Sequence, residues 1–176
     1  MLGVYSFDSY YKTKSADDQN ARKPVMAMNA DEALTATSRA IYMARDLINV
    51  PAEDMSPQQL QNATEALAQE YSASVRAVVG EDLIKDNFPQ IFAVGKAARL
   101  PDHSRAPRLI EMTWAGDEDL PKVVLVGKGV CFDTGGLDLK PAAGMRNMKK
   151  DMGGAACVLA LAEMVMANKL KCNLTL

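Results

Sequence analysis

The sequence predicts an α/β fold with a mixed sheet covered by helices. Two segments with apolar residues at helical spacing, 30–49 and 57–71, precede several short apolar segments of strand length. A third helical segment, 155–168, leads into a last apolar segment at 172–176. Alternation of helices and short strands is typical of a mixed sheet packed against helices, and 176 residues suffice for one domain with a core.

The composition is that of a soluble globular protein and excludes several functional classes. Hydrophobic residues make up 48% of the chain and charged residues 24%, so disorder is not expected. A formal net charge of -2 offers neither a basic field for nucleic acid nor a polybasic membrane patch. No apolar run approaches the ~20 residues that span a bilayer, and residues 1–20 lack the apolar core of a signal peptide. We expect a cytoplasmic protein.

The first half of the chain begins with an irregular segment and continues with two helices. Residues 1–24 are polar and aromatic without sustained periodicity, and we interpret them as a connecting arm. Asn29, with Glu32 three residues later, predicts the N-cap of a helix over 30–49 that ends before Pro51. Ser56 followed by Pro57 predicts the start of the second helix.

The second half contains the predicted strands. Polar segments with proline and glycine separate them, and a short helix is expected over 81–85. Gly153 and Gly154 open the third helix. The expected strands are 75–79, 91–94, 108–114, 123–126 and 172–176.

The segment 123–156 concentrates the residues that could carry chemistry. Lys128 lies between two glycines just after an apolar run typical of a buried strand, and it is either a functional lysine or a solvated turn lysine. Asp133 shortly precedes two glycines and could simply form a turn. Asp151 could simply be the N-terminal carboxylate of the third helix, which the helix dipole favours. Together with Lys140, however, these residues are the materials of a divalent-metal hydrolytic site. The Gly-Lys-Gly triplet does not satisfy the P-loop pattern.

The string VGKGVCFDTGGLDLKPAAGMRNMKKDMGGAA resembles the central motif of the leucyl aminopeptidase family, which are cytosolic two-metal exopeptidases. Upstream, DLIN at 46–49 followed by Pro51 resembles the start of that family's catalytic domain. Segments 88–98 and 107–110 are also similar, so the resemblance covers the chain from about residue 25. It implies that 25–176 is a partial catalytic domain, joined through the arm 1–24 to an N-terminal domain of which most is missing.

The resemblance also implies roles for individual residues. Lys128 and Asp151 would bind the tightly held metal, and Asp133 would bridge both metals. Lys140 would polarise the scissile carbonyl, and Met148 would line the pocket for the first side chain of a peptide with a free N-terminus. Two zinc or manganese ions, possible bicarbonate and a homohexamer are implied for the complete protein.

Three departures from the family pattern affect this interpretation. Cys131 stands where threonine is common and is either a thiolate ligand or a small buried residue. Asp138 stands where serine is common and could hold Lys140 in a salt bridge away from the substrate. The N-T-D-A-E-G-R motif, which supplies the remaining ligands, does not occur in the sequence. With three of five ligands, we expect this chain alone to be inactive; the alternative is a non-catalytic structural or regulatory module.

Overall fold

The structure is a computed structural model, and it describes residues 5–10, 31–98, 103–116 and 118–176. Its centre is a four-stranded mixed sheet in the order β1-β2-β4-β3. The pairs β1–β2 and β2–β4 are antiparallel, and β3 runs parallel to β4. The predicted α/β class with a mixed sheet is confirmed. The strands are β1 (Ser74–Val79), β2 (Arg108–Trp114), β3 (Lys122–Val124) and β4 (Asn173–Thr175).

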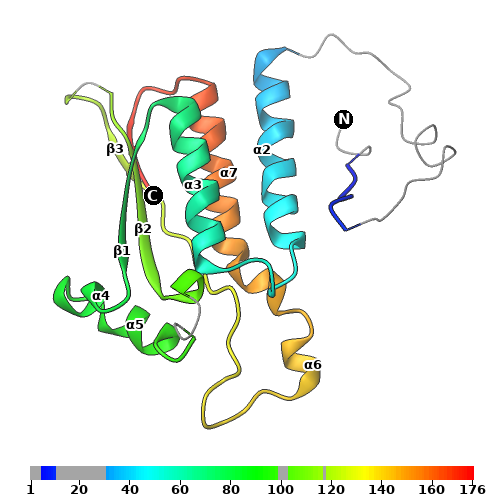
Figure 1. Cartoon of the computed structure of the whole chain (residues 1–176). Coiled ribbons are helices and arrows are strands. Elements are labelled where there is room, and N and C mark those ends of the chain that lie inside the picture. Colours follow the sequence, from blue (N-terminus) through cyan, green and yellow to red (C-terminus); the bar gives the residue numbers. More distant parts are fainter. Residues whose placement is uncertain (1–4, 11–30, 99–102, 117) are drawn as a thin grey trace, which may run out of the picture.

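Three long helices lie side by side next to the sheet (Figure 1). α3 contacts β1 and β2, whereas α2 packs chiefly against α7. In the described part of the chain, no helix is both long and apolar enough to cross a membrane. The long helices are α2 (Glu32–Asn49), α3 (Pro57–Tyr71) and α7 (Gly153–Ala167). The shorter ones are α4 (Asp82–Lys85), α5 (Pro89–Gly95), α6 (Ala142–Met145) and the 3₁₀ helices η2 (His103–Arg105) and η3 (Met148–Met152).

Side-chain caps determine where the first two long helices begin. The predicted cap Ser56 is confirmed, because its hydroxyl accepts a hydrogen bond from Gln59 N at 3.3 Å. α2 instead begins after Asp31, whose carboxylate accepts from Leu34 N at 2.7 Å. The predicted cap Asn29 lies outside the described residues, as does the arm apart from residues 5–10.

Two strand predictions need correction. Residues 91–94 lie in α5 and not in a strand, because Pro89 stands in the first turn of a helix and a short apolar run is ambiguous between the two structures. The apolar run 123–126 is a strand only up to Val124, although Leu125 N still donates to Thr175 O at 2.8 Å. This strand is not buried either, since every residue of β3 is exposed.

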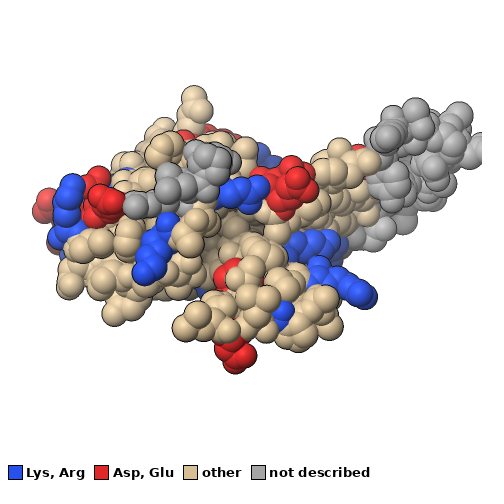
Figure 2. Space-filling view, turned by 60° about the horizontal axis from the view of Figure 1, so that its bottom comes forward, with Lys and Arg blue, Asp and Glu red and all other residues tan. Residues whose placement is uncertain are grey.

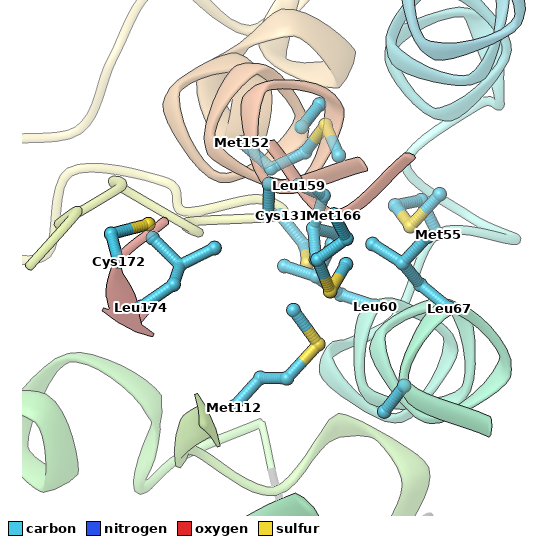
Figure 3. Packing of buried hydrophobic residues seen from close by; sticks show 13 residues of the cluster. Met55, Leu60, Leu67, Met112, Cys131, Met152, Leu159, Met166, Cys172 and Leu174 are labelled. Atoms are coloured by element: carbon cyan, nitrogen blue, oxygen red, sulfur yellow. The ribbon is translucent and has the colours of Figure 1, made fainter. Parts of the chain in front are cut away.

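The core lies between the helices and the sheet and is rich in methionine and leucine. Figure 3 shows Leu60 and Leu67 of α3, Leu159 and Met166 of α7 and Met112 of β2 pointing toward one another. Leu174 of the last strand completes this cluster and is fully buried. Removing such side chains from water is the main stabilising contribution to the fold.

One buried charge holds the three long helices together. Glu163 of α7 is only 2% exposed, and its carboxylate accepts a hydrogen bond from Arg39 Nε of α2. Arg39 also bonds Glu70 of α3 at 2.6 Å and the Tyr71 hydroxyl at 2.8 Å. The two carboxylates raise the pKa of Arg39, so the guanidinium stays charged. A single arginine therefore links α2, α3 and α7.

We predict that Arg39→Ala lowers the free energy of unfolding by about 2 to 3 kcal/mol, because it leaves the Glu163 carboxylate buried without its partner. The value lies below the ~3–5 kcal/mol of a fully buried pair because Arg39 is half exposed. Urea denaturation measures the change. The control is Arg76→Ala, which removes an exposed pair with Asp86 and should cost less than about 1 kcal/mol. Equal losses in both variants would contradict the prediction.

Candidate active site

The site begins where the segment after β3 crosses the start of α7 in close backbone contact. A Cβ on Gly127 would lie 2.7 Å from Ala155 Cα, and one on Gly154 would lie 2.9 Å from Lys128 N. The backbones are joined by a hydrogen bond from Ala155 N to Lys128 O at 2.9 Å. Glycine at both positions therefore permits a contact that fixes the backbone of Lys128 against the helix.

Lys128 and Asp151 form the first of two ion pairs at this site. Lys128 Nζ lies 2.9 Å from Asp151 Oδ2, which η3 carries just before α7 begins. The hydrogen bond to Asp151 raises the pKa of Lys128 above its ordinary value, and the negative charge of Asp151 adds to this effect. The ion pair therefore favours the ammonium form of Lys128.

Asp133 and Lys140 form the second ion pair, across a glycine turn. Lys140 Nζ lies 2.6 Å from Asp133 Oδ1, and the same oxygen accepts a hydrogen bond from Gly135 N at 2.8 Å. Lys140 N closes the turn by donating to Thr134 O at 2.9 Å. The hydrogen bond from Lys140 lowers the pKa of Asp133, with a smaller contribution from Gly135 N. Asp133 thus forms a turn and carries a stable negative charge.

Lys140 is held from two directions, and neither involves Asp138. Besides its ion pair with Asp133, the ammonium group lies 3.5 Å from the sulfur of Met148, which is buried. Asp138 is exposed, so the expectation that it captures Lys140 is wrong for this structure. The reason is that Gly135, with φ of 95°, turns the chain so that Asp133 meets Lys140.

Cys131 behaves as a small buried residue. Its side chain belongs to the hydrophobic core cluster and is 7% exposed. Burial raises the pKa of the Cys131 thiol to about 11, although Arg105 and Arg108 oppose this shift. The thiol is therefore neutral at physiological pH, as packing would require.

The two ion pairs belong to one site. The charge of Asp133 contributes to the raised pKa of Lys128, and the charge of Lys128 contributes to the lowered pKa of Asp133. Over the described ranges, no three His, Cys, Asp or Glu side chains gather to hold a metal ion, so a third donor here would have to be the Lys128 amine. Two carboxylates and one amine are oxygen and nitrogen donors that suit zinc or manganese. The donor set therefore fits a divalent metal.

One contact of the site was not predicted from the sequence. Lys149 Nζ donates to Asn49 Oδ1 at 3.2 Å and so joins η3 to the end of α2. In the sequence, Asn49 is notable only as the last residue of the DLIN motif at 46–49. A separation of one hundred positions leaves no local pattern that could reveal the pair.

Comparisons with known proteins agree on one family. The model of the cytosol aminopeptidase family, catalytic domain, matches residues 42–176. A probable cytosol aminopeptidase of Rhodococcus jostii strain RHA1 is 37% identical over 183 residues, which is 96% of this chain and 35% of the relative. The chain thus spans about a third of the length of such relatives.

Solved structures show the same likeness in three dimensions. The cytosol aminopeptidase from Coxiella burnetii superimposes with a TM-score of 0.81 at 42% identity, covering 99% of this chain and 36% of that one. The bottromycin maturation enzyme BotP in complex with Mn gives a TM-score of 0.76 at 30% identity over 99% of this chain and 36% of that one. The leucyl aminopeptidase from Trypanosoma brucei in complex with bestatin gives 0.76 at 28% identity, with 93% and 33% covered.

We predict that Gly154→Ala destabilises the chain by about 1 to 3 kcal/mol, because the new methyl group would overlap the backbone of Lys128. Gly153→Ala is the matched control. A Cβ there would meet Ile48 Cδ1 at 3.5 Å, an ordinary contact, and the residue already has a helical φ of -60°. Thermal unfolding of both variants measures the difference. Similar midpoints for the two would show that the close contact is not needed.

Proposed function

Because the chain belongs to the cytosol aminopeptidase family, we propose that it carries part of the active site of a metal-dependent aminopeptidase. The substrates are peptides with a free N-terminus, from which the complete enzyme releases the first residue. The observation that carries this proposal is the gathering of Lys128, Asp133, Lys140 and Asp151 into two coupled ion pairs at the start of α7. We also propose that residues 25–176 are the partial catalytic domain and 1–24 the arm that precedes it.

Each residue has a proposed role that follows from its chemistry. Asp133 and Asp151 present carboxylate oxygens, and Lys128 binds a metal only after its ammonium group loses a proton. A bound divalent cation supplies Lewis-acid chemistry, polarising a carbonyl group and making water more acidic. Zinc and manganese both fit these donors, and the complex of BotP with Mn supports manganese as a probe. The complete enzyme is proposed to hold two such ions together with bicarbonate.

Lys140 and Met148 are proposed to face the substrate. The amino group of Lys140 lies beside Asp133, and a cation in this position would stabilise the negative charge that develops on the carbonyl oxygen. The buried Met148 lies against the ammonium group and offers an adaptable apolar wall for the first side chain of the peptide. The names of the relatives support a cytoplasmic location, and we propose a homohexamer for the complete protein.

We predict that Mn²⁺ binding to the chain tightens as the pH rises. The pKa of Lys128 is raised, so below that pKa the metal must displace one proton, and affinity should increase roughly tenfold per pH unit. Isothermal titration calorimetry between pH 6 and pH 9 measures this slope and the proton release. Asp151→Ala should remove binding. A slope unchanged in Lys128→Met would contradict the role of the lysine as a ligand.

We predict that the 176-residue chain has no aminopeptidase activity of its own, because three donors do not make a two-metal site. The measurement is hydrolysis of a leucine amide substrate with added manganese or zinc. Activity that Lys140→Ala abolishes would overturn the prediction. Absence of both hydrolysis and metal binding would favour a non-catalytic structural or regulatory module instead.

A further inference from the structure

Asn49, the last residue of α2, connects the candidate site with the aromatic segment 5–10. Its Oδ1 accepts a hydrogen bond from Lys149 Nζ at 3.2 Å, and its Nδ2 donates to Tyr5 Oη at 3.3 Å. Tyr5 Oη in turn donates to Asp46 Oδ1 at 2.6 Å. The amide of Asn49 has a donor, Nδ2, and an acceptor, Oδ1. Because Nδ2 donates to the Tyr5 hydroxyl, Oδ1 faces Lys149.

Tyr5 is held firmly enough to orient this amide. Its ring stacks at an angle on Tyr42, with centroids 5.2 Å apart, and the guanidinium of Arg45 lies 5.3 Å from the ring centroid. Asp46 adds the hydrogen bond at the hydroxyl end. The ring therefore contacts two side chains of the last turns of α2 and the hydroxyl a third, which gives the hydroxyl a defined position.

The other end of the amide contacts a short segment whose position depends on tertiary contacts. Lys149 belongs to η3, the five-residue 3₁₀ helix that also carries Met148 and Asp151 and has no side-chain cap. Short 3₁₀ helices have poor hydrogen-bond geometry and depend on tertiary contacts. Beyond it, Gly153 lies against Ile48, so the end of α2 borders both η3 and the first residue of α7.

We propose that Asn49 is a positioning residue for the metal site. Its amide oxygen, aimed by the Tyr5 hydroxyl, holds Lys149 and thereby fixes the turn from which Asp151 meets Lys128. Groups that orient a metal ligand without touching the metal commonly control affinity. The inference rests on the proposed metal site, but its first consequence concerns the metal-free chain and can be tested separately.

The first experiment is hydrogen exchange of the metal-free chain, read at peptides that cover 148–152. Asn49→Ala should speed exchange there by about tenfold, because local opening of η3 becomes easier. The control is Asn62→Ala, which removes an exposed amide that hydrogen-bonds Gln58 and Gln59 within α3. Exchange in η3 that is equal in the wild type and Asn49→Ala would overturn the inference, whether or not the chain binds metal.

The second experiment is a double-mutant cycle on Mn²⁺ affinity, measured by calorimetry for the wild type, Asn49→Ala, Lys149→Met and the double variant. Asn49→Ala should weaken binding by roughly tenfold when Lys149 is present and hardly at all in the K149M background. The cycle cancels the direct effect of the Lys149 charge on the cation. Each effect of Asn49→Ala is measured between two proteins that have the same residue at position 149.

The outcomes separate this inference from the proposed function. A wild-type chain that binds no metal while Asn49→Ala still loosens η3 would contradict the metal site and leave the positioning contact established. Metal binding with equal weakening in both lysine backgrounds would show that Asn49 acts only through stability and would overturn the inference. If Asn49→Ala weakens Mn²⁺ binding only when Lys149 is present, the result supports the inference.

Discussion

The close passage of two backbones at Gly127 and Gly154 is the constraint on which the candidate site depends. It allows Ala155 N to donate to Lys128 O, which fixes the segment after β3 against the first turn of α7. Lys128 of one segment then meets Asp151, which lies just before the other. A methyl group at either glycine would force the segments apart, and Lys128 would lose its place beside Asp151.

This contact can fix the position of Lys128 only because α7 itself is held in place. The Arg39–Glu163 pair ties α7 to α2, and Arg39 reaches α3 through Glu70. The apolar core joins α7 to the sheet (Figure 3). On the face shown in Figure 2, residues of both charges are scattered among uncharged ones, which agrees with the small net charge.

The elements with clear local signals were predictable from sequence. Ser56 followed by Pro57 marks a helix start whatever the tertiary structure, and β1 and β2 have strand composition over their full lengths. The strand prediction for 91–94 was wrong because four apolar residues fit a strand and a short helix equally well, and only Pro89 favoured the helix. The sequence indicated one set of candidate site residues: Lys128, Asp133, Lys140 and Asp151. It did not indicate how they pair, because the chain path through Gly135 decides which carboxylate each lysine meets.

The pairing of two lysines with two aspartates has a consequence for how a cation would arrive. The formal charges of Lys128, Asp133, Lys140 and Asp151 sum to zero, so these four side chains together present no net charge to a cation. A divalent ion would have to compete directly with an ammonium group for a carboxylate, so its capture would be an exchange of one cation for another.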